Sequence, residues 1–70
     1  METGRLIRVS KFRGDPQSVA YIVAMADAGS AIELIRAKVV TGDHDIEDLG
    51  RVSEALLIAL KLQPGEFMRA

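Results

Sequence analysis

The sequence contains no cysteine, no tryptophan and only one histidine. The absence of cysteine excludes disulfide bonds and thiolate metal sites, and a single histidine excludes a histidine cluster. No activated nucleophile can be assembled either, because neither a cysteine–histidine pair nor a serine in a nucleophile turn is present. We therefore expect no catalytic residue, no metal and no cofactor, and we expect the chain not to be an enzyme.

A long apolar run is also missing. The longest, from Val19 to Ala26, has eight residues, whereas a membrane-spanning helix needs about 20. The first residues, Met1 to Arg5, do not lead into the apolar core of a signal peptide. These observations predict a chain without a membrane segment and a cytoplasmic location.

No strong excess of one charge is present. Nine basic and ten acidic residues give a net charge of −1, which does not favour a general nucleic-acid binder. The charges are unevenly placed: an early basic group contains Arg5, Arg8, Lys11 and Arg13, and a later acidic group contains Asp43, Asp45, Glu47 and Asp48. The acidic group has the spacing of a calcium loop, but Asp48 stands where that loop requires glycine, so no metal is expected there.

Apolar residues are abundant for so short a chain. The 70 residues, of which 49% are hydrophobic, suffice for a single domain over residues 1–70. A domain of this size buries only about 60% of the surface of its unfolded chain. Because disulfides and metals are excluded, association is the remaining source of stability. We expect a homodimer, or a complex with another protein.

The first half of the chain predicts a strand and a helix. Residues 5–12 alternate between apolar and polar side chains, which indicates a half-buried strand. A turn at residues 13–16 follows, in which Asp15 can cap a helix and Pro16 can begin it. Residues 16–28 are rich in alanine and predict a helix that is apolar nearly all round, and Gly29 would end it.

The second half holds one ambiguous segment and one long predicted helix. Residues 31–40 fit a helix begun by a capping box of Ser30 and Glu33, but their β-branched residues also fit a strand. Residues 46–62 predict a helix with an apolar stripe on one side and further apolar residues opposite. After a turn at residues 63–65, the tail of residues 66–70 either folds back onto the body or is loose.

The predicted fold class is α+β and mostly helical. An N-terminal strand would be followed by two or three helices, with a β-α-β-α arrangement as the alternative, and dimerisation would complete the fold. In the dimer, the strand could pair with its symmetry mate and surplus apolar helix faces could meet. The predicted interface residues are Ile7, Val9, Tyr21, Met25, Ala55, Ile58 and Leu62.

The N-terminal half resembles the ribbon-helix-helix repressors in outline. A strand with Arg8 and Ser10 on its outer side precedes two predicted helices, and residues 29–36 are similar to the turn and second-helix start of that family. The resemblance implies dimerisation through paired strands, with DNA contacted by Arg5, Arg8, Ser10 and Lys11. The long third helix and the slightly acidic charge depart from the family. The sequence therefore favours a non-enzymatic interaction or regulatory module acting as a homo-oligomer, with DNA binding as the alternative.

Overall fold

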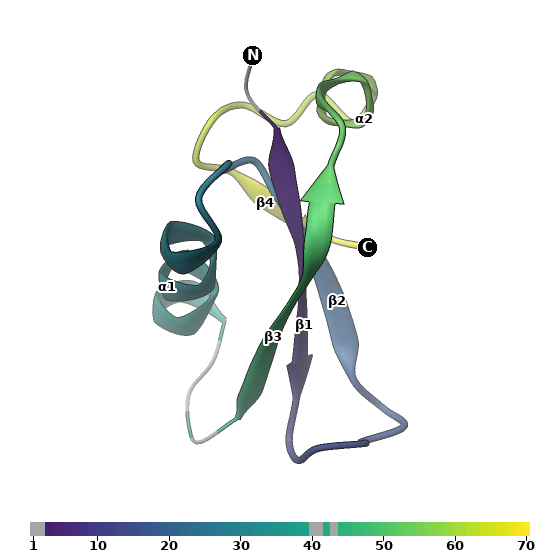
Figure 1. Cartoon of the computed structure of the whole chain (residues 1–70), viewed down its shortest axis with the longest axis vertical. Coiled ribbons are helices and arrows are strands. Elements are labelled where there is room, and N and C mark those ends of the chain that lie inside the picture. The colour runs from purple at the N-terminus through teal and green to yellow at the C-terminus, as the bar shows by residue number, and fades with distance from the viewer. Residues whose placement is uncertain (1–2, 40–41, 43) are drawn as a thin grey trace.

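The computed structural model describes residues 3–39, 42 and 44–70. Along the chain, the elements are β1 (Gly4–Ser10), β2 (Val19–Val23), α1 (Ala28–Lys38), β3 (Asp45–Val52), α2 (Glu54–Ala59) and β4 (Phe67–Arg69) (Figure 1). Strands account for more of the chain than helices. The expectation of a mostly helical protein was therefore wrong, and so was the β-α-β-α alternative.

The four strands form one antiparallel sheet in the order β3-β1-β2-β4. The register places Leu6 opposite Ile22, and Ile22 opposite Met68, so these three side chains form a row on one face. β1 lies in the centre of the sheet, with a neighbour on each side. It cannot pair with its symmetry mate, and the strand–helix–helix order of the ribbon-helix-helix family is not the order found here.

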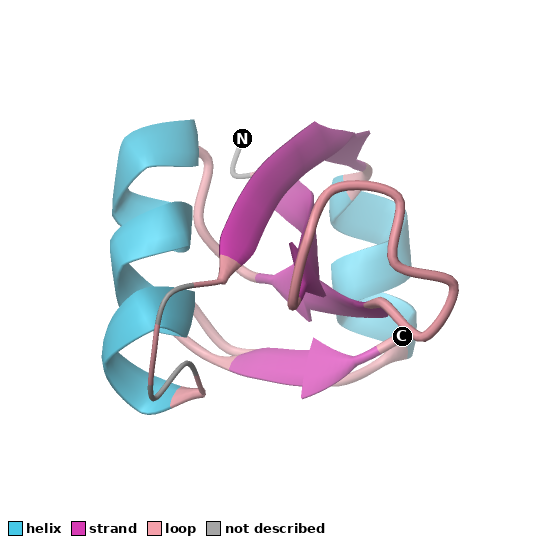
Figure 2. Ribbon diagram, turned by 90° about the horizontal axis from the view of Figure 1, so that it is seen from below, coloured by secondary structure: helices cyan, strands magenta, loops and turns pink. Residues whose placement is uncertain are grey.

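The two helices lie on opposite sides of the sheet (Figure 2). We call the sheet face with Ile7 and Val23 the α1 face, because these residues pack with Ala31 and Ile35 of α1. We call the other the α2 face, on which Leu6 and Ile22 pack near Leu57 of α2. α2 is short and lies at the end of the sheet where β1 begins (Figure 1). The α2 face is therefore covered only in part.

The helix predicted over residues 16–28 was wrong. β2 occupies Val19–Val23, and α1 begins only at Ala28. β2 consists of four β-branched or aromatic residues and one alanine, which suit a strand. It is apolar on both sides because it lies inside the sheet with a helix packed on each face, not because it is a buried helix. Asp15 accepts hydrogen bonds from the backbone N–H groups of Lys11 and Gln17 and so stabilises a turn.

The prediction of a long helix over residues 46–62 was also wrong for the first half of that range. β3 occupies Asp45–Val52, and only the short α2 falls within the predicted range. Gly50 lies opposite Leu6 while Asp48 lies opposite Ile7, so Leu49 is one extra residue in β3 and creates a β-bulge. The bulge makes the spacing of apolar residues in β3 resemble that of a helix.

The bulge lets β3 contribute to both faces of the sheet. Ile46 and Val52 are six residues apart and would share one face of a regular strand. Instead, Ile46 packs against the cluster under α1, and Val52 belongs to the cluster near α2. Gly50 has a φ of +130°, a region that residues with a side chain rarely adopt.

The helical interpretation of residues 31–40 was the better one, since α1 spans Ala28–Lys38. Its N-cap is Asp27 instead of Ser30, because the Asp27 carboxylate accepts hydrogen bonds from the backbone N–H and the hydroxyl of Ser30, both at 2.8 Å. The C-terminal tail does fold back onto the body, as β4. Within the described residues, neither helix is long and apolar enough to cross a membrane.

We predict that Gly50→Ala lowers the free energy of unfolding by about 1–3 kcal/mol. The added Cβ would meet no atom within 4 Å, so the loss would come from the φ of +130° alone. Chemical denaturation measures it. Gly29→Ala, in the first turn of α1, is the control and should be neutral or stabilising. A Gly50→Ala variant as stable as the wild type would contradict the bulge.

The cap of α1 predicts a dependence of stability on pH. The hydrogen bonds from the Ser30 backbone and side chain hold the pKa of Asp27 below its ordinary value of 3.8. Because this pKa is lower in the folded than in the unfolded chain, the stabilisation is complete above about pH 4 and lost as the pH falls through the folded pKa. We expect Asp27→Ala to lower the melting temperature at pH 7, with the difference narrowing below about pH 4. A difference independent of pH would contradict this role.

Candidate functional site

The predicted interface residues of the first half are mostly part of the core. Ile7 is 0% exposed, so a partner could not reach it without opening the fold. Val9, Tyr21 and Met25 are half-buried and pack against the cluster under α1. The Tyr21 ring meets the Phe67 ring of β4 edge to face, with 6.0 Å between ring centroids. These side chains hold one chain together.

The predicted interface residues of the second half lie on or just after α2. Ile58 is 67% exposed, and Ala55 is exposed as well. Leu62 is half-buried and packs against the second core cluster. Ile58 and Leu62 line a mainly apolar cavity of about 240 Å³, together with Ala24 and Pro64. This cavity lies between α2 and the segment that leads into β4.

The basic residues of β1 do not form a free positive surface. Arg5 forms an ion pair with Asp48, and Arg8 forms one with Glu47. Ser10 is 7% exposed. Lys11 is exposed, but it lies beyond the strand, in the loop that joins β1 to β2. Two of the four residues expected to contact DNA are thus paired with carboxylates of β3.

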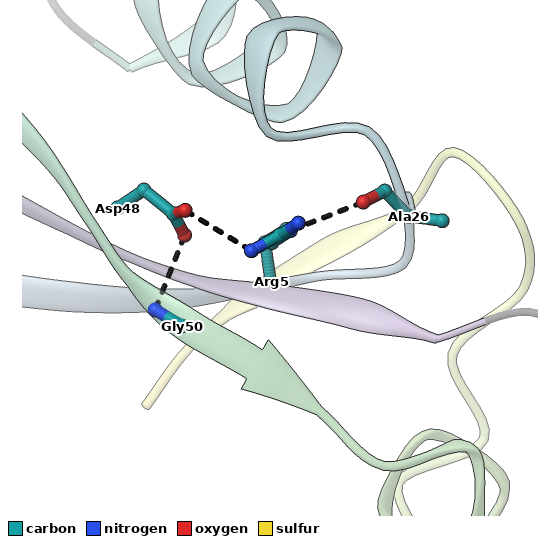
Figure 3. Close-up of polar contacts among 4 residues, drawn as sticks. All are labelled: Arg5, Ala26, Asp48 and Gly50. Atoms are coloured by element: carbon teal, nitrogen blue, oxygen red, sulfur yellow. Dashed lines mark hydrogen bonds and ion pairs between the residues drawn. The ribbon is translucent and has the colours of Figure 1, made fainter.

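Arg5 joins three segments of the fold (Figure 3). One guanidinium N–H donates to a carboxylate oxygen of Asp48 at 3.1 Å, and Nε donates to the carbonyl oxygen of Ala26 at 3.0 Å. The other carboxylate oxygen of Asp48 accepts from the backbone N–H of Gly50 at 3.2 Å. Arg5 therefore ties the bulge of β3 to β1 and to the segment before α1. Its role is structural.

Two cavities lined in part by charged side chains have little that selects a ligand. The first, about 180 Å³, lies beside Lys11, Asp15 and His44, and is smaller than the ~300 Å³ at which ligand pockets begin. The second, about 390 Å³, is lined by Arg8 and Arg13 but also by Asp45 and Glu47, so its charges balance. Among residues 3–39, 42 and 44–70, no three acidic or histidine side chains gather as metal ligands do. Asp43 of the acidic group lies outside the described residues.

The α2 face and the adjoining edge of the sheet contain residues that the sequence pattern does not single out. Met68 is 37% exposed and Leu56 is 41% exposed, although both are large and apolar. Met68 lies at the end of the row that starts with Leu6 and Ile22. The signal was the apolar pair Phe67 and Met68 just after the turn at residues 63–65. Three residues were too few to indicate a strand.

No protein-family model matches the chain, and no curated protein or solved structure is detectably similar to it. The candidate site therefore depends on geometry alone. It consists of the partly covered α2 face and β4, which is an edge strand of the sheet. An apolar face beside an open strand edge is suited to binding a polypeptide.

We predict that Arg5→Ala lowers the free energy of unfolding by about 1–3 kcal/mol, because Asp48 loses a charged donor in a partly buried site. Urea denaturation measures the loss. Arg8→Ala is the matched control: the Arg8 and Glu47 side chains are 41% and 56% exposed, and an exposed pair contributes less than about 1 kcal/mol. Equal losses for the two variants would contradict the structural role of Arg5.

Proposed function

We propose that this protein is a small, non-enzymatic interaction module that works as a homo-oligomer through its α2 face and the adjoining edge of the sheet. One observation supports the proposal above others. Ile58, Leu56 and Met68 are 67%, 41% and 37% exposed. These side chains lie on α2 and on the edge strand, and Ile58 and Met68 border the half-buried residues Leu62 and Ile22.

The small core supports the same proposal. Among the residues that the structure describes, seven hydrophobic ones are buried, and the sheet divides them into two clusters. Because a short chain gains little from so small a core, covering the α2 face would add stability. A stable complex buries about 800 Å² per partner, which is about one sixth of the 4710 Å² that this chain exposes.

The non-enzymatic part of the proposal is supported by the way polar groups pair within the chain. The Asp15 carboxylate is bound by backbone N–H groups, and Arg5 and Arg8 are bound by carboxylates of β3. These groups are occupied in holding loops and strands together. We further propose a cytoplasmic location, with which the absence of cysteine is compatible.

Light scattering coupled to size-exclusion chromatography tests the proposal. We expect the wild type to elute as a dimer at micromolar concentration, and Ile58→Asp to raise its dissociation constant by about tenfold or more, because a charge would enter an apolar contact. Phe12→Asp is the matched control: Phe12 is 57% exposed and lies in the loop at the opposite end of the sheet (Figure 1).

The control should dimerise as the wild type does, and circular dichroism should show that both variants are folded. A wild type that remains monomeric up to high micromolar concentration would contradict the proposed function. So would an Ile58→Asp variant that associates as tightly as the wild type.

A further inference from the structure

We propose that two copies of this chain pair through the outer edges of their β4 strands, in antiparallel orientation and centred on Met68, to form one continuous eight-stranded sheet. This inference rests on the proposed function and names its partner, a second copy, and its geometry.

The outer edge of β4 presents unpaired backbone groups. On the inner side, Ile22 is the register partner of Met68, the Glu66 carbonyl accepts from the Ala24 N–H, and the Ala70 N–H donates to the Ala20 carbonyl. Backbone groups of alternate residues point to the same side of a strand. The N–H and C=O groups of Phe67 and Arg69 therefore point away from β2, where the described part of the chain places no further strand.

The other sheet edge, β3, is protected against self-pairing. Asp45 and Glu47 lie on the same face of β3, opposite Ser10 and Arg8. In an antiparallel pair of two β3 strands, these like charges would come together and repel. The bulge at Leu49 also distorts the edge, which is a common device against edge-to-edge association. β4 has no bulge and no acidic residue, and its only charge is Arg69.

The length of β4 decides the register. Only Phe67 and Arg69 offer outward groups, and centring the pair on Met68 places Phe67 of each copy opposite Arg69 of the other. That arrangement uses all outward groups of both strands in four hydrogen bonds. It also places the Arg69 guanidinium beside the Phe67 ring of the partner, where a cation is attracted to an aromatic face.

The pairing continues the apolar row on the α2 face. Within one chain, the row runs from Leu6 to Ile22 to Met68 and stops at the exposed edge. In the dimer, the two Met68 side chains would lie next to each other, and the row would extend through both sheets. Met68 is 37% exposed in one chain. In the dimer, it would lie at the centre of the interface.

Arg69→Pro tests the pairing, because proline removes only an outward N–H and leaves the hydrogen bonds to β2 in place. We expect its dimer dissociation constant to rise at least about tenfold, since one hydrogen bond is lost from each copy. Arg69→Ala keeps the N–H and loses only the cation–aromatic contact, so it is the matched control: the dissociation constant of Arg69→Pro should be at least about tenfold above that of Arg69→Ala. Light scattering and analytical ultracentrifugation give both values.

A cross-linking variant tests the register and covers the case in which Arg69→Pro does not fold. In the proposed pair, the two Met68 Cα atoms would be about 4.5 Å apart, a separation that a disulfide can span. Met68→Cys should form a covalent dimer under mild oxidation, and no other cysteine can compete. Lys11→Cys, whose side chain would be exposed in the loop after β1, should form little covalent dimer.

The outcomes separate the two proposals. A wild-type dimer that Arg69→Pro leaves intact, or in which Met68→Cys and Lys11→Cys cross-link equally, would overturn the edge pairing while leaving homo-oligomerisation standing. Open-ended assemblies instead of dimers would also overturn it, because they would indicate β4 pairing with β3 of the next copy. A strictly monomeric wild type would contradict the proposed function as well.

Discussion

The bulge in β3 decides how this strand contributes to the core on the two faces of the sheet. By adding Leu49 between Asp48 and Gly50, it turns the second half of β3 over, so that Ile46 supports the cluster under α1 and Val52 supports the cluster near α2. The bulge is held by Arg5 and Asp48 and made possible by the positive φ of Gly50. One edge strand thereby contributes residues to the core on both faces of the sheet.

The division of the core between the two faces of the sheet affects how the chain can associate. Dividing a small set of buried residues between two faces leaves neither face with a large core, and α2 is too short to cover its side completely. The same bulge that organises the fold, together with Asp45 and Glu47, makes β3 a poor surface for self-pairing. β4, which has no acidic residue, is left as the open edge, and the proposed homodimer follows from that asymmetry between the two edges.

From local patterns, residues 31–40 fitted both a helix and a strand, whereas the first strand and the turns were predictable because alternation and turn residues are local. β2 was not, since a short run that is apolar on both sides fits a buried helix and a central strand equally well. β3 was misread because the bulge gave Ile46, Leu49 and Val52 a helical spacing. Gly50 was the signal that should have counted against a helix interior. In the candidate site, Ile58 was predictable as a surplus apolar residue, but Met68 became visible only when the sheet placed it beside Ile22.

Nuclear Overhauser contacts along residues 45–52 test whether this segment is a strand with a bulge at Leu49. We expect cross-strand contacts between Ile7 and Asp48 and between Leu6 and Gly50, with Leu49 left without a partner on β1. We also expect strong sequential Hα–HN contacts, as in extended chains. Contacts between residues three and four positions apart would indicate that this segment is a helix. They would contradict the bulge, the division of the core, and the open edge at β4.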